Sequence, residues 1–381
     1  MPQAAQMTPQ QALQLNIAKR QTLLATSPRF RKNLGITTGG VLGGNSRVKL
    51  YNVGIITGLL LSVTTTIDIT TGATQSAQGP YNLISRLRLT DYDGTDRINC
   101  TGDELFIINC IRAQEYAGYP NGQNGTVVNT PVVPTGAGAA QALQFFLYVP
   151  LAFDPERDLR GAIMAQTSVG ELYLSIDWNS AYVNTVGADH TKPYSSTTAI
   201  IQNAGTTIGV QVWQDYLVPQ AMANNRPILP EYDLMTVYEI NGNVRSLDNL
   251  AAGVEKVISF PNVRSVIGMY LKYVNGGIMN AGTDISQLRI IANGNNIISD
   301  ETALAHLWMI RVWCNSMDTR AGFYPFLFRG KPVETAQFGN VQVGINPSVV
   351  TANTQPTYVG VCTESFYTKG STLPGILQSS T

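Results

Sequence analysis

Two histidines, His190 and His306, are the side chains of this chain best suited to acid–base chemistry near neutral pH. His190 lies in a stretch rich in Gly, Asn, Asp and Thr, which predicts a loop. His306 lies in a short helical stretch, where packing or hydrogen bonding is the expected role. No Ser-His-Asp, Cys-His or HExxH arrangement can be assembled from local motifs. We therefore assign neither histidine a catalytic role and predict that the chain is not an enzyme.

The acidic run Asp91-Tyr92-Asp93-Gly94-Thr95-Asp96 is a second candidate for chemistry, because its carboxylates alternate as in a calcium-binding loop. The downstream Glu of an EF-hand is missing, and a hairpin turn at Asp93-Gly94 explains the same residues. We interpret the run as a turn and predict no metal and no cofactor, with a cation at this loop as the alternative.

The cysteines and the apolar runs bear on where the chain folds. Four cysteines show no CxxC and no metal-ligand spacing: Cys100, Cys110, Cys314 and Cys362. We interpret them as buried free thiols of a protein that folds in a reducing cytoplasm. The first fifteen residues show no signal peptide. The most apolar stretch, 53–63, is about half the length of a bilayer span and is interpreted as a strand.

Charge separates the N-terminal segment from the rest of the chain. The chain has 25 basic and 25 acidic side chains, and the first acidic residue is Asp68. Seven basic residues precede it: Lys19, Arg20, Arg29, Arg31, Lys32, Arg47 and Lys49. The remainder therefore carries 18 basic and 25 acidic side chains, a net charge of −7. A basic segment on an acidic body predicts an anionic partner on one side, either phospholipid head groups or nucleic acid.

The basic segment is predicted to begin with a helix. Thr8 can cap it, Pro9 suits its first position and Gln11 completes a capping box. The helix would run to about Thr26, and its apolar stripe is interrupted by polar residues. We expect it to dock on a neighbour or at a membrane surface.

A glycine-rich hinge is predicted to follow, at Gly39-Gly40-Val41-Leu42-Gly43-Gly44. A segment with few apolar residues and one sign of charge cannot bury enough surface to fold alone. We therefore expect residues 1–44 to be dispensable for folding of the body.

An internal duplication organises the rest of the chain, where short runs rich in Val, Ile, Thr and Tyr alternate with turn signals. Five segments recur in the same order: 53–61 as 265–271, 84–89 as 285–290, Asp103-Glu104 as Asp300-Glu301, 170–176 as 339–345, and 210–215 as 359–364. All intervals are longer in the first copy, as expected for one fold with larger surface loops. The pairing predicts that Gly58 superposes on Gly268 and Val212 on Val361.

The duplication predicts an all-β protein of two tandem eight-stranded jelly-roll β-sandwiches, with short helices and an N-terminal helical arm. The expected divisions are a basic arm over 1–47, a first jelly roll over 48–217, a linker over 218–231, a second jelly roll over 232–368 and a C-terminal tail over 369–381. A charged fraction of only 13% favours large neutral surfaces that are buried against further copies. Trp178 and Trp213 are candidate core or interface anchors.

Six sets of segments carry a resemblance to a known protein family. They are Thr8-Pro9-Gln10-Gln11-Ala12-Leu13, Gly79-Pro80-Tyr81-Asn82-Leu83, 148–152 with 158–162, 228–230 with Asp233-Leu234, 275–277 with 280–285, and Asn340-Val341 with Asn346-Pro347. In these segments, spread over nearly its whole length, the chain resembles the major capsid proteins of tectiviruses, tail-less phages with an internal membrane. The resemblance implies a double jelly roll, homotrimers that form pseudo-hexagonal capsomers, and an icosahedral shell over a lipid vesicle.

The resemblance also implies partners and a location. Five basic residues of the arm are expected to face membrane phospholipid or neighbouring capsomers: Lys19, Arg20, Arg29, Arg31 and Lys32. Each basic residue near an anionic surface adds about 1 kcal/mol of attraction. Penton or vertex proteins and other minor capsid proteins are further implied partners, with no specific nucleic-acid recognition. The protein would be made in the host bacterial cytoplasm and reside in the virion.

Two other functions are compatible with a β-sandwich protein of this composition. One is a vertex or receptor-binding β-protein of a similar virus, and the other is a carbohydrate-binding or carbohydrate-active protein. The basic arm argues against both, because neither needs an inward anchor.

Overall fold

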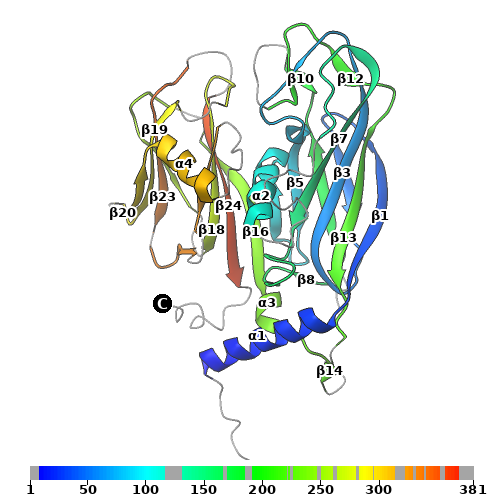
Figure 1. Cartoon of the computed structure of the whole chain (residues 1–381), viewed down its shortest axis with the longest axis vertical. Coiled ribbons are helices and arrows are strands. Elements are labelled where there is room, and N and C mark those ends of the chain that lie inside the picture. Colours follow the sequence, from blue (N-terminus) through cyan, green and yellow to red (C-terminus); the bar gives the residue numbers. More distant parts are fainter. Residues whose placement is uncertain are drawn as a thin grey trace, which may run out of the picture.

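The computed structural model describes residues 8–115, 131–165, 170–184, 191–220, 222–223, 226–246, 250–260, 264–279, 283–294, 296–313, 322–328, 332–338, 340–351 and 357–368. These residues form two β-sandwiches side by side, with helix α1 beneath them (Figure 1). His190 and the predicted C-terminal tail lie outside the described residues. The fold is the all-β double sandwich that the sequence predicts.

The first sandwich is built from two sheets, with the strand orders β1-β13-β3-β7 and β2-β9-β5-β6. Their bounds are β1 Arg29–Gly40, β2 Asn45–Lys49, β3 Ile55–Ile69, β5 Ile84–Thr90, β6 Asp96–Cys100, β7 Gly138–Pro150, β9 Tyr173–Trp178 and β13 Ile208–Leu217. The last strand lies beside the first, and the chain crosses repeatedly between the sheets, which is jelly-roll topology. In β3, Leu59, Leu61 and Val63 are fully buried in the core, whereas Leu60 between them points to the outer face.

The second sandwich repeats this arrangement, with the orders β16-β24-β18-β21 and β17-β23-β19-β20. Its strands are β16 Thr236–Ser246, β17 Lys256–Ser259, β18 Ser265–Val274, β19 Ile285–Ala292, β20 Asn296–Glu301, β21 Phe323–Leu327, β23 Val341–Pro347 and β24 Tyr358–Thr368. Each sandwich therefore has eight principal strands in the same order, as the duplication predicts.

The two copies agree in register as well as in strand order. Gly58 on β3 lies opposite Asp215 on β13, and Gly268 on β18 lies opposite Glu364 on β24. A one-residue bulge adjoins both pairs, on the same strand and at the same position. A Cβ at Gly58 would lie 2.0 Å from the hydroxyl of Tyr148, so glycine is required at this close approach.

The second sheet of each sandwich shows the same correspondence. Ser85 of β5 and Ser286 of β19 each lie at a one-residue bulge beside the neighbouring strand. The Oγ of Ser85 donates to the carbonyl of Asp177, and that of Ser286 donates to the carbonyl of Asn346, both at 3.0 Å. Shared registers, bulges and hydrogen bonds confirm the duplication.

One of the five sequence pairings is wrong in register. Helix α2, Gly102–Glu115, follows β6, and helix α4, Ala303–Trp313, follows β20. Because Leu87 pairs with Cys100 and Leu288 with Glu301, Cys100 corresponds to Glu301. The Asp-Glu dipeptide at 103 begins a helix, whereas the one at 300 ends a strand. The pairing of these two dipeptides is therefore a coincidence of composition, and it is displaced by about one helical turn from the true alignment.

The two sandwiches are joined by a shared sheet and by buried charges. β6 pairs in parallel with β16, so one sheet of the first sandwich continues into one sheet of the second. Helix α2 also reaches across: the Oδ2 of Asp103 contacts the Nζ of Lys272, and the Nε of Arg112 lies 2.6 Å from the Oε1 of Glu364. All four side chains are almost completely buried. Breaking such a buried pair is costly, so these two pairs help to hold the sandwiches together.

The predicted arm over 1–47 extends too far along the chain. β1 pairs with β13, and β2 pairs with β9, so residues 29–49 supply the first two strands of the first sandwich. The predicted hinge is a packed corner: a Cβ at Gly40 would lie 2.8 Å from the carbonyl oxygen of Ile208 and from the Nε1 of Trp178. β1 is largely exposed and lacks apolar alternation, which is why its sequence does not indicate a strand.

Short elements complete the described residues. They are η1 Tyr81–Leu83, β4 Thr74–Gln75, β8 Ile163–Met164, β10 Val183–Asn184, β11 Tyr194–Ser195, β12 Ile201–Asn203, β14 Met222–Ala223, β15 Arg226–Pro227, α3 Glu231–Met235 and β22 Val333–Glu334. β14 and β15 pair within the predicted linker, and α3 leads from it into β16.

Candidate functional site at the base of the molecule

Helix α1, Pro9–Thr26, lies across the base of the molecule (Figure 1). The hydroxyl of Thr8 accepts from the backbone N–H of Gln11, whose side chain accepts from the N–H of Thr8. This is the predicted capping box, with Pro9 at the first helical position. At the other end the N–H of Ser27 donates to the carbonyl of Leu23 and closes the helix.

One leucine fastens the helix to the body. Leu23 is fully buried, in a small cluster that is separate from the two sandwich cores. Its partners come from β3, β13 and the loop after β7: Ile55, Ala152, Leu159, Ala162 and Leu217. Helix α1 therefore packs against its own chain, where the sequence predicted docking on a neighbour or a membrane.

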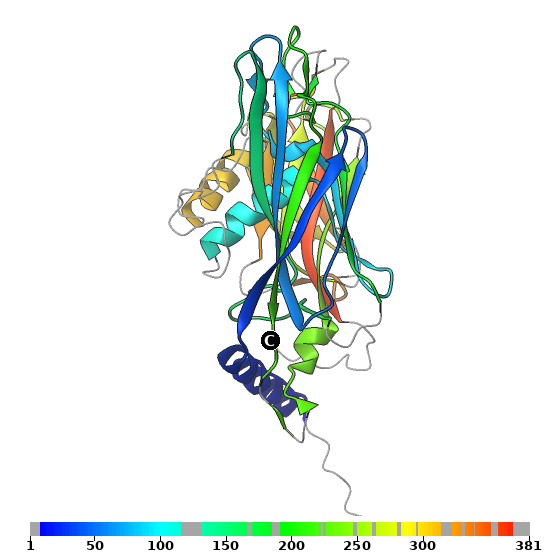
Figure 2. The ribbon, with the colours of Figure 1, turned by 90° about the vertical axis from the view of Figure 1, so that its right-hand side faces the viewer.

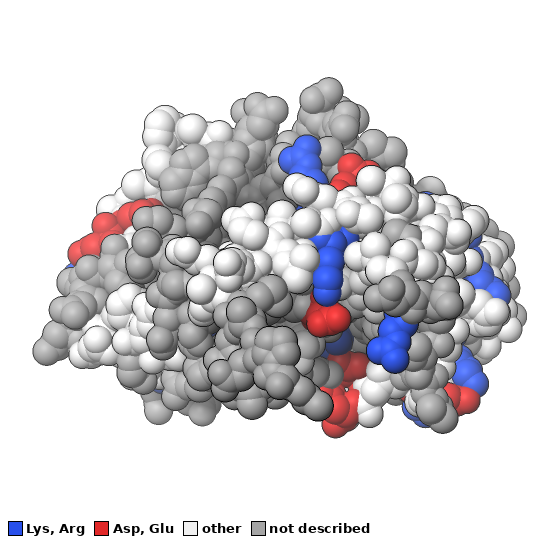
Figure 3. Space-filling model, turned by 90° about the horizontal axis from the view of Figure 1, so that it is seen from below, with Lys and Arg blue, Asp and Glu red and all other residues white. Residues whose placement is uncertain are grey.

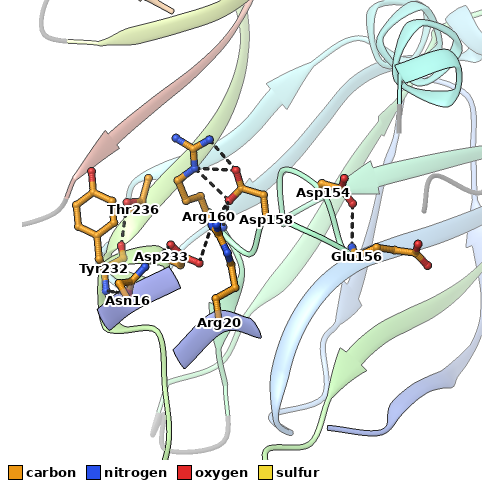
Figure 4. A network of polar contacts seen from close by, with 9 residues as sticks. All are labelled: Asn16, Arg20, Asp154, Glu156, Asp158, Arg160, Tyr232, Asp233 and Thr236. Atoms are coloured by element: carbon orange, nitrogen blue, oxygen red, sulfur yellow. Dashed lines mark hydrogen bonds and ion pairs between the residues drawn. The ribbon is translucent and has the colours of Figure 1, made fainter. Parts of the chain in front are cut away.

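A polar network holds the middle of the helix (Figure 4). Asn16 donates from its Nδ2 to the Oδ1 of Asp233 at 2.8 Å and accepts from the backbone N–H of Tyr232 at 3.1 Å. The Nη1 of Arg20 lies 3.3 Å from the Oδ2 of Asp233 and 3.4 Å from the Oδ1 of Asp158. Burial raises the pKa of Asp233, and the charge of Arg20 and the hydrogen bond from Asn16 oppose that rise.

The loop after β7 supplies the other half of the network. Arg160 clamps Asp158 through its Nε and Nη2, at 2.9 and 2.6 Å from the Oδ2. In the same loop the N–H of Glu156 donates to the Oδ1 of Asp154 at 2.9 Å. These contacts hold the loop as an acidic platform beneath which α1 lies (Figure 4).

The remaining predicted site residues also have partners in their own chain. The Nζ of Lys19 lies 3.6 Å from Glu231, and the Nη1 of Arg29 lies 3.0 Å from Glu156. Arg31 makes a bidentate pair with Asp215, at 2.6 and 2.9 Å, and this hydrogen bond raises the pKa of its guanidinium. The Nζ of Lys32 lies 3.3 Å from the ring centroid of Tyr51.

Four of the five predicted site cations, all but Lys32, are therefore neutralised locally. The five carboxylates that pair with them were not identified as their partners by the sequence analysis: Glu156, Asp158, Asp215, Glu231 and Asp233. Seen from below, basic and acidic side chains lie next to one another on this face (Figure 3). The partners lie more than one hundred residues apart in sequence, so no local spacing could reveal them.

The other candidates for chemistry have structural contacts. His306 is buried, with its Nδ1 3.0 Å from Glu301 and its Nε2 2.8 Å from the carbonyl of Pro325. The carboxylate of Asp91 pairs with Arg97 at 2.7 Å, and Gly94 turns the chain between β5 and β6 with a φ of 83°, as the interpretation of this run as a turn predicts. Across the described ranges, three or more His, Cys, Asp or Glu side chains nowhere gather in a way that could hold a metal ion. Among the same residues, no helix is long and apolar enough to cross a membrane.

Comparison with known proteins identifies the family. A family model described as P3 major capsid protein N-terminal matches residues 1–219, and one described as P3 major capsid protein C-terminal matches residues 235–377. The chain belongs to the P3 major capsid protein family. Major capsid protein P3 of Enterobacteria phage PRD1 is 29% identical over 384 residues, which cover 93% of this chain and 94% of that relative.

Solved structures agree with this assignment at the level of the fold. The STIV MCP has a TM-score of 0.66 at 12% identity, covering 93% of this chain and 99% of its own. The major capsid protein P2 from Bacteriophage PM2 has a TM-score of 0.52 at 9% identity, covering 90% and 99%. The predicted resemblance is confirmed: the chain is a major capsid protein of the double jelly-roll type and a component of the virion. Membership of this structural family sets aside the vertex and carbohydrate alternatives.

Proposed function

We propose that three copies of the chain form a pseudo-hexagonal capsomer of an icosahedral shell. The observation that carries this proposal is the duplication: each chain supplies two sandwiches with one strand order and one set of bulges. Three chains arranged around a threefold axis would present six similar units, which suits a hexagonal lattice. Closed cyclic symmetry is also the usual arrangement of soluble homo-oligomers.

Light scattering coupled to size-exclusion chromatography tests the proposal. Purified protein is expected to elute with three times the 41.2 kDa mass of the chain. A monomer at micromolar concentration would contradict it, because obligate interfaces bury several thousand Å² and persist on dilution.

An internal lipid membrane beneath the base is the second part of the proposal. Helix α1 lies at one end of the elongated molecule, and Lys19 and Arg29 keep 29% and 43% of their side chains exposed. These cations could exchange their carboxylate partners for phosphate oxygens at little cost, because exposed pairs are weak. Arg20 is less exposed and has two carboxylates, so we assign it to holding the helix.

Liposome flotation tests the membrane contact. The double variant Lys19→Gln, Arg29→Gln should bind anionic vesicles more weakly than the unmodified protein, and added salt should mimic that loss. The matched control is Arg47→Gln, Arg88→Gln, which removes two charges from the first sandwich. Equal loss with both double variants would show only a dependence on net charge and would contradict a membrane face at the base.

Further partners follow from the geometry of a closed shell. An icosahedral shell has fivefold positions that a pseudo-hexagonal unit cannot fill, so a penton or vertex protein and other minor capsid proteins would complete it. Specific recognition of nucleic acid is not part of the proposal, because contacts with phosphate oxygens position a protein but do not read base sequence.

A further inference from the structure

Helix α4 carries an apolar stripe on its outer side. Leu304, Trp308 and Val312 lie four residues apart, so they line one side of the helix, and they are 63%, 64% and 55% exposed. On the inner side, Ala303 and Leu307 pack into the core of the second sandwich. Three large apolar side chains exposed in a row indicate a contact surface.

Helix α2 shows what covers the corresponding stripe in the first sandwich. The strand registers that precede the two helices align the stripe of α4 with three residues of α2: Asp103, Ile107 and Ile111. All three are at most 1% exposed. Asp103 contacts Lys272 of the second sandwich, so α2 presents this side to the next sandwich in the chain.

The surface that receives α2 also has a counterpart. Tyr270 and Cys362, on the outer face of β18 and β24, are fully buried in one cluster with α2, and Glu364 accepts from Arg112 of α2 at 2.6 Å. The matched registers give their counterparts on the first sandwich as Leu60, Trp213 and Asp215. These three are only partly buried. No helix of the described residues covers the sheet that carries them, which faces the viewer in Figure 2.

A hollow of about 310 Å³ opens on this uncovered face beside Asp215. Arg31, Tyr148 and Tyr216 contribute to its lining. It lies at the counterpart of Glu364, the residue that Arg112 of α2 reaches in the second sandwich. The first sandwich therefore has an open site where the second has an inserted helix.

The sheet edges give the same correspondence and supply a register. β6 and β16 pair in parallel, with Ile98 opposite Ile240 and Asn99 opposite Asn241. β20 corresponds to β6, and β1 corresponds to β16. Among the described residues, each of these two strands pairs on one side only. Transfer of the register places Ser299 opposite Arg31 and Asp300 opposite Lys32.

We propose that α4 and β20 of one copy dock on the β1-β13-β3 face of a second copy, repeating the contact between the two sandwiches of one chain. The stripe of α4 covers Leu60 and Trp213, and Asp300 meets Lys32 of the other copy with opposite charge. This inference rests on the proposed trimer and specifies its interface.

A second copy fits this surface better than another partner, because the chain already contains the same contact. Each sandwich has one side with a helix and an edge strand, and another side with a sheet that can receive them. In a single chain, the helix side of the second sandwich and the sheet side of the first remain uncovered, on opposite sides of the molecule (Figure 1). A head-to-tail contact of this kind generates a ring when its rotation closes. Three chains would then have six near-equivalent contacts.

A disulfide trap tests the register. The double variant Asp300→Cys, Lys32→Cys is oxidised and analysed on a non-reducing gel. Adjacent strands place paired Cα atoms within disulfide range, and the two positions are far apart within one chain, so the trap forms only between copies. We expect covalent dimers and trimers at tenfold or more above the control double variant Asp300→Cys, Lys49→Cys. Equal yields from the two double variants would overturn the proposal.

A surface variant tests the stripe independently. Leu304→Glu, Trp308→Glu should abolish the trimer in light scattering while the circular dichroism spectrum is unchanged, because neither side chain is buried in the single chain. The control Ile200→Glu, Val254→Glu alters equally exposed apolar residues elsewhere and should remain trimeric. If the trimer survives Leu304→Glu, Trp308→Glu and the Asp300→Cys, Lys32→Cys variant gives no disulfide above its control, the interface is overturned and the proposed trimer stands. A wild-type monomer would overturn both.

Discussion

Asp233 lies against α1 with its carboxylate almost completely buried, and its partners Asn16 and Arg20 both come from that helix. Burial raises its pKa, which means that folding disfavours its ionised form. A carboxyl group whose pKa is higher in the folded than in the unfolded state favours folding at low pH, where it is protonated. This contribution to stability is lost as the pH rises through the pKa of the folded state. At neutral pH the two helix residues therefore compensate a buried charge.

Removal of Arg20 should expose that cost. We expect Arg20→Ala to lower the free energy of unfolding by about 2 kcal/mol at pH 7, since Asp233 would keep only Asn16 as a partner. The loss should shrink as the pH falls and Asp233 is protonated. The double variant Arg20→Ala, Asp233→Asn should recover part of it. Urea denaturation measures these values, and Lys19→Ala, which breaks an exposed pair, should cost no more than about 0.5 kcal/mol. Equal losses at pH 7 and at pH 4 would contradict the role of Asp233.

Glu104 gives a second prediction at the residue scale. It lies buried beside Asp103, Lys272 and Gly242 at the joint between the sandwiches, and burial raises its pKa while Lys272 opposes the rise and Asp103 adds to it. As for Asp233, a raised pKa means that the ionised form of Glu104 destabilises the fold when the pH is above the pKa in the folded state. Glu104→Gln should therefore raise the melting temperature at pH 8. It should have little effect near pH 4, because a protonated Glu104 carries no charge, just as Gln carries none. The exposed control Glu231→Gln should show no such dependence, and a lower melting temperature at pH 8 would contradict this account.

At the scale of elements, α1 and β1 are parts of the body. Leu23 fills a cluster that would otherwise open Ile55 and Leu217 to water, and β1 covers the edge of β13. The expectation that residues 1–44 are dispensable for folding is therefore withdrawn. Deletion of residues 1–27 should yield a folded protein of lower stability. Deletion of residues 1–44 should leave the edge of β13 unpaired and cause aggregation.

A single substitution gives this prediction a magnitude. Leu23→Ala should cost about 3 kcal/mol, because it leaves a cavity among packed apolar side chains. Leu15→Ala, on the exposed side of the same helix, should cost less than about 0.5 kcal/mol. Denaturant unfolding of both variants is the measurement. Similar small effects would show that α1 is only loosely attached.

For the whole molecule, the repeated fold was predictable because its markers lie in strands with strict geometry. Gly58 and Gly268 adjoin equivalent bulges, and Ser85 and Ser286 lie at equivalent bulges, so both pairs are constrained by backbone packing and survive in the sequence. β1 was missed because both of its faces are largely exposed and it shows no period of two. The acidic partners of the basic segment were missed because ion pairs between distant segments have no sequence period.

The central claim is that three chains close into a ring of six near-equivalent sandwiches. Single-particle electron microscopy of the purified protein tests it most directly. The account predicts class averages with a hexagonal outline, six lobes and threefold symmetry. Averages that show isolated two-lobed particles, or rings of another number of chains, would contradict it.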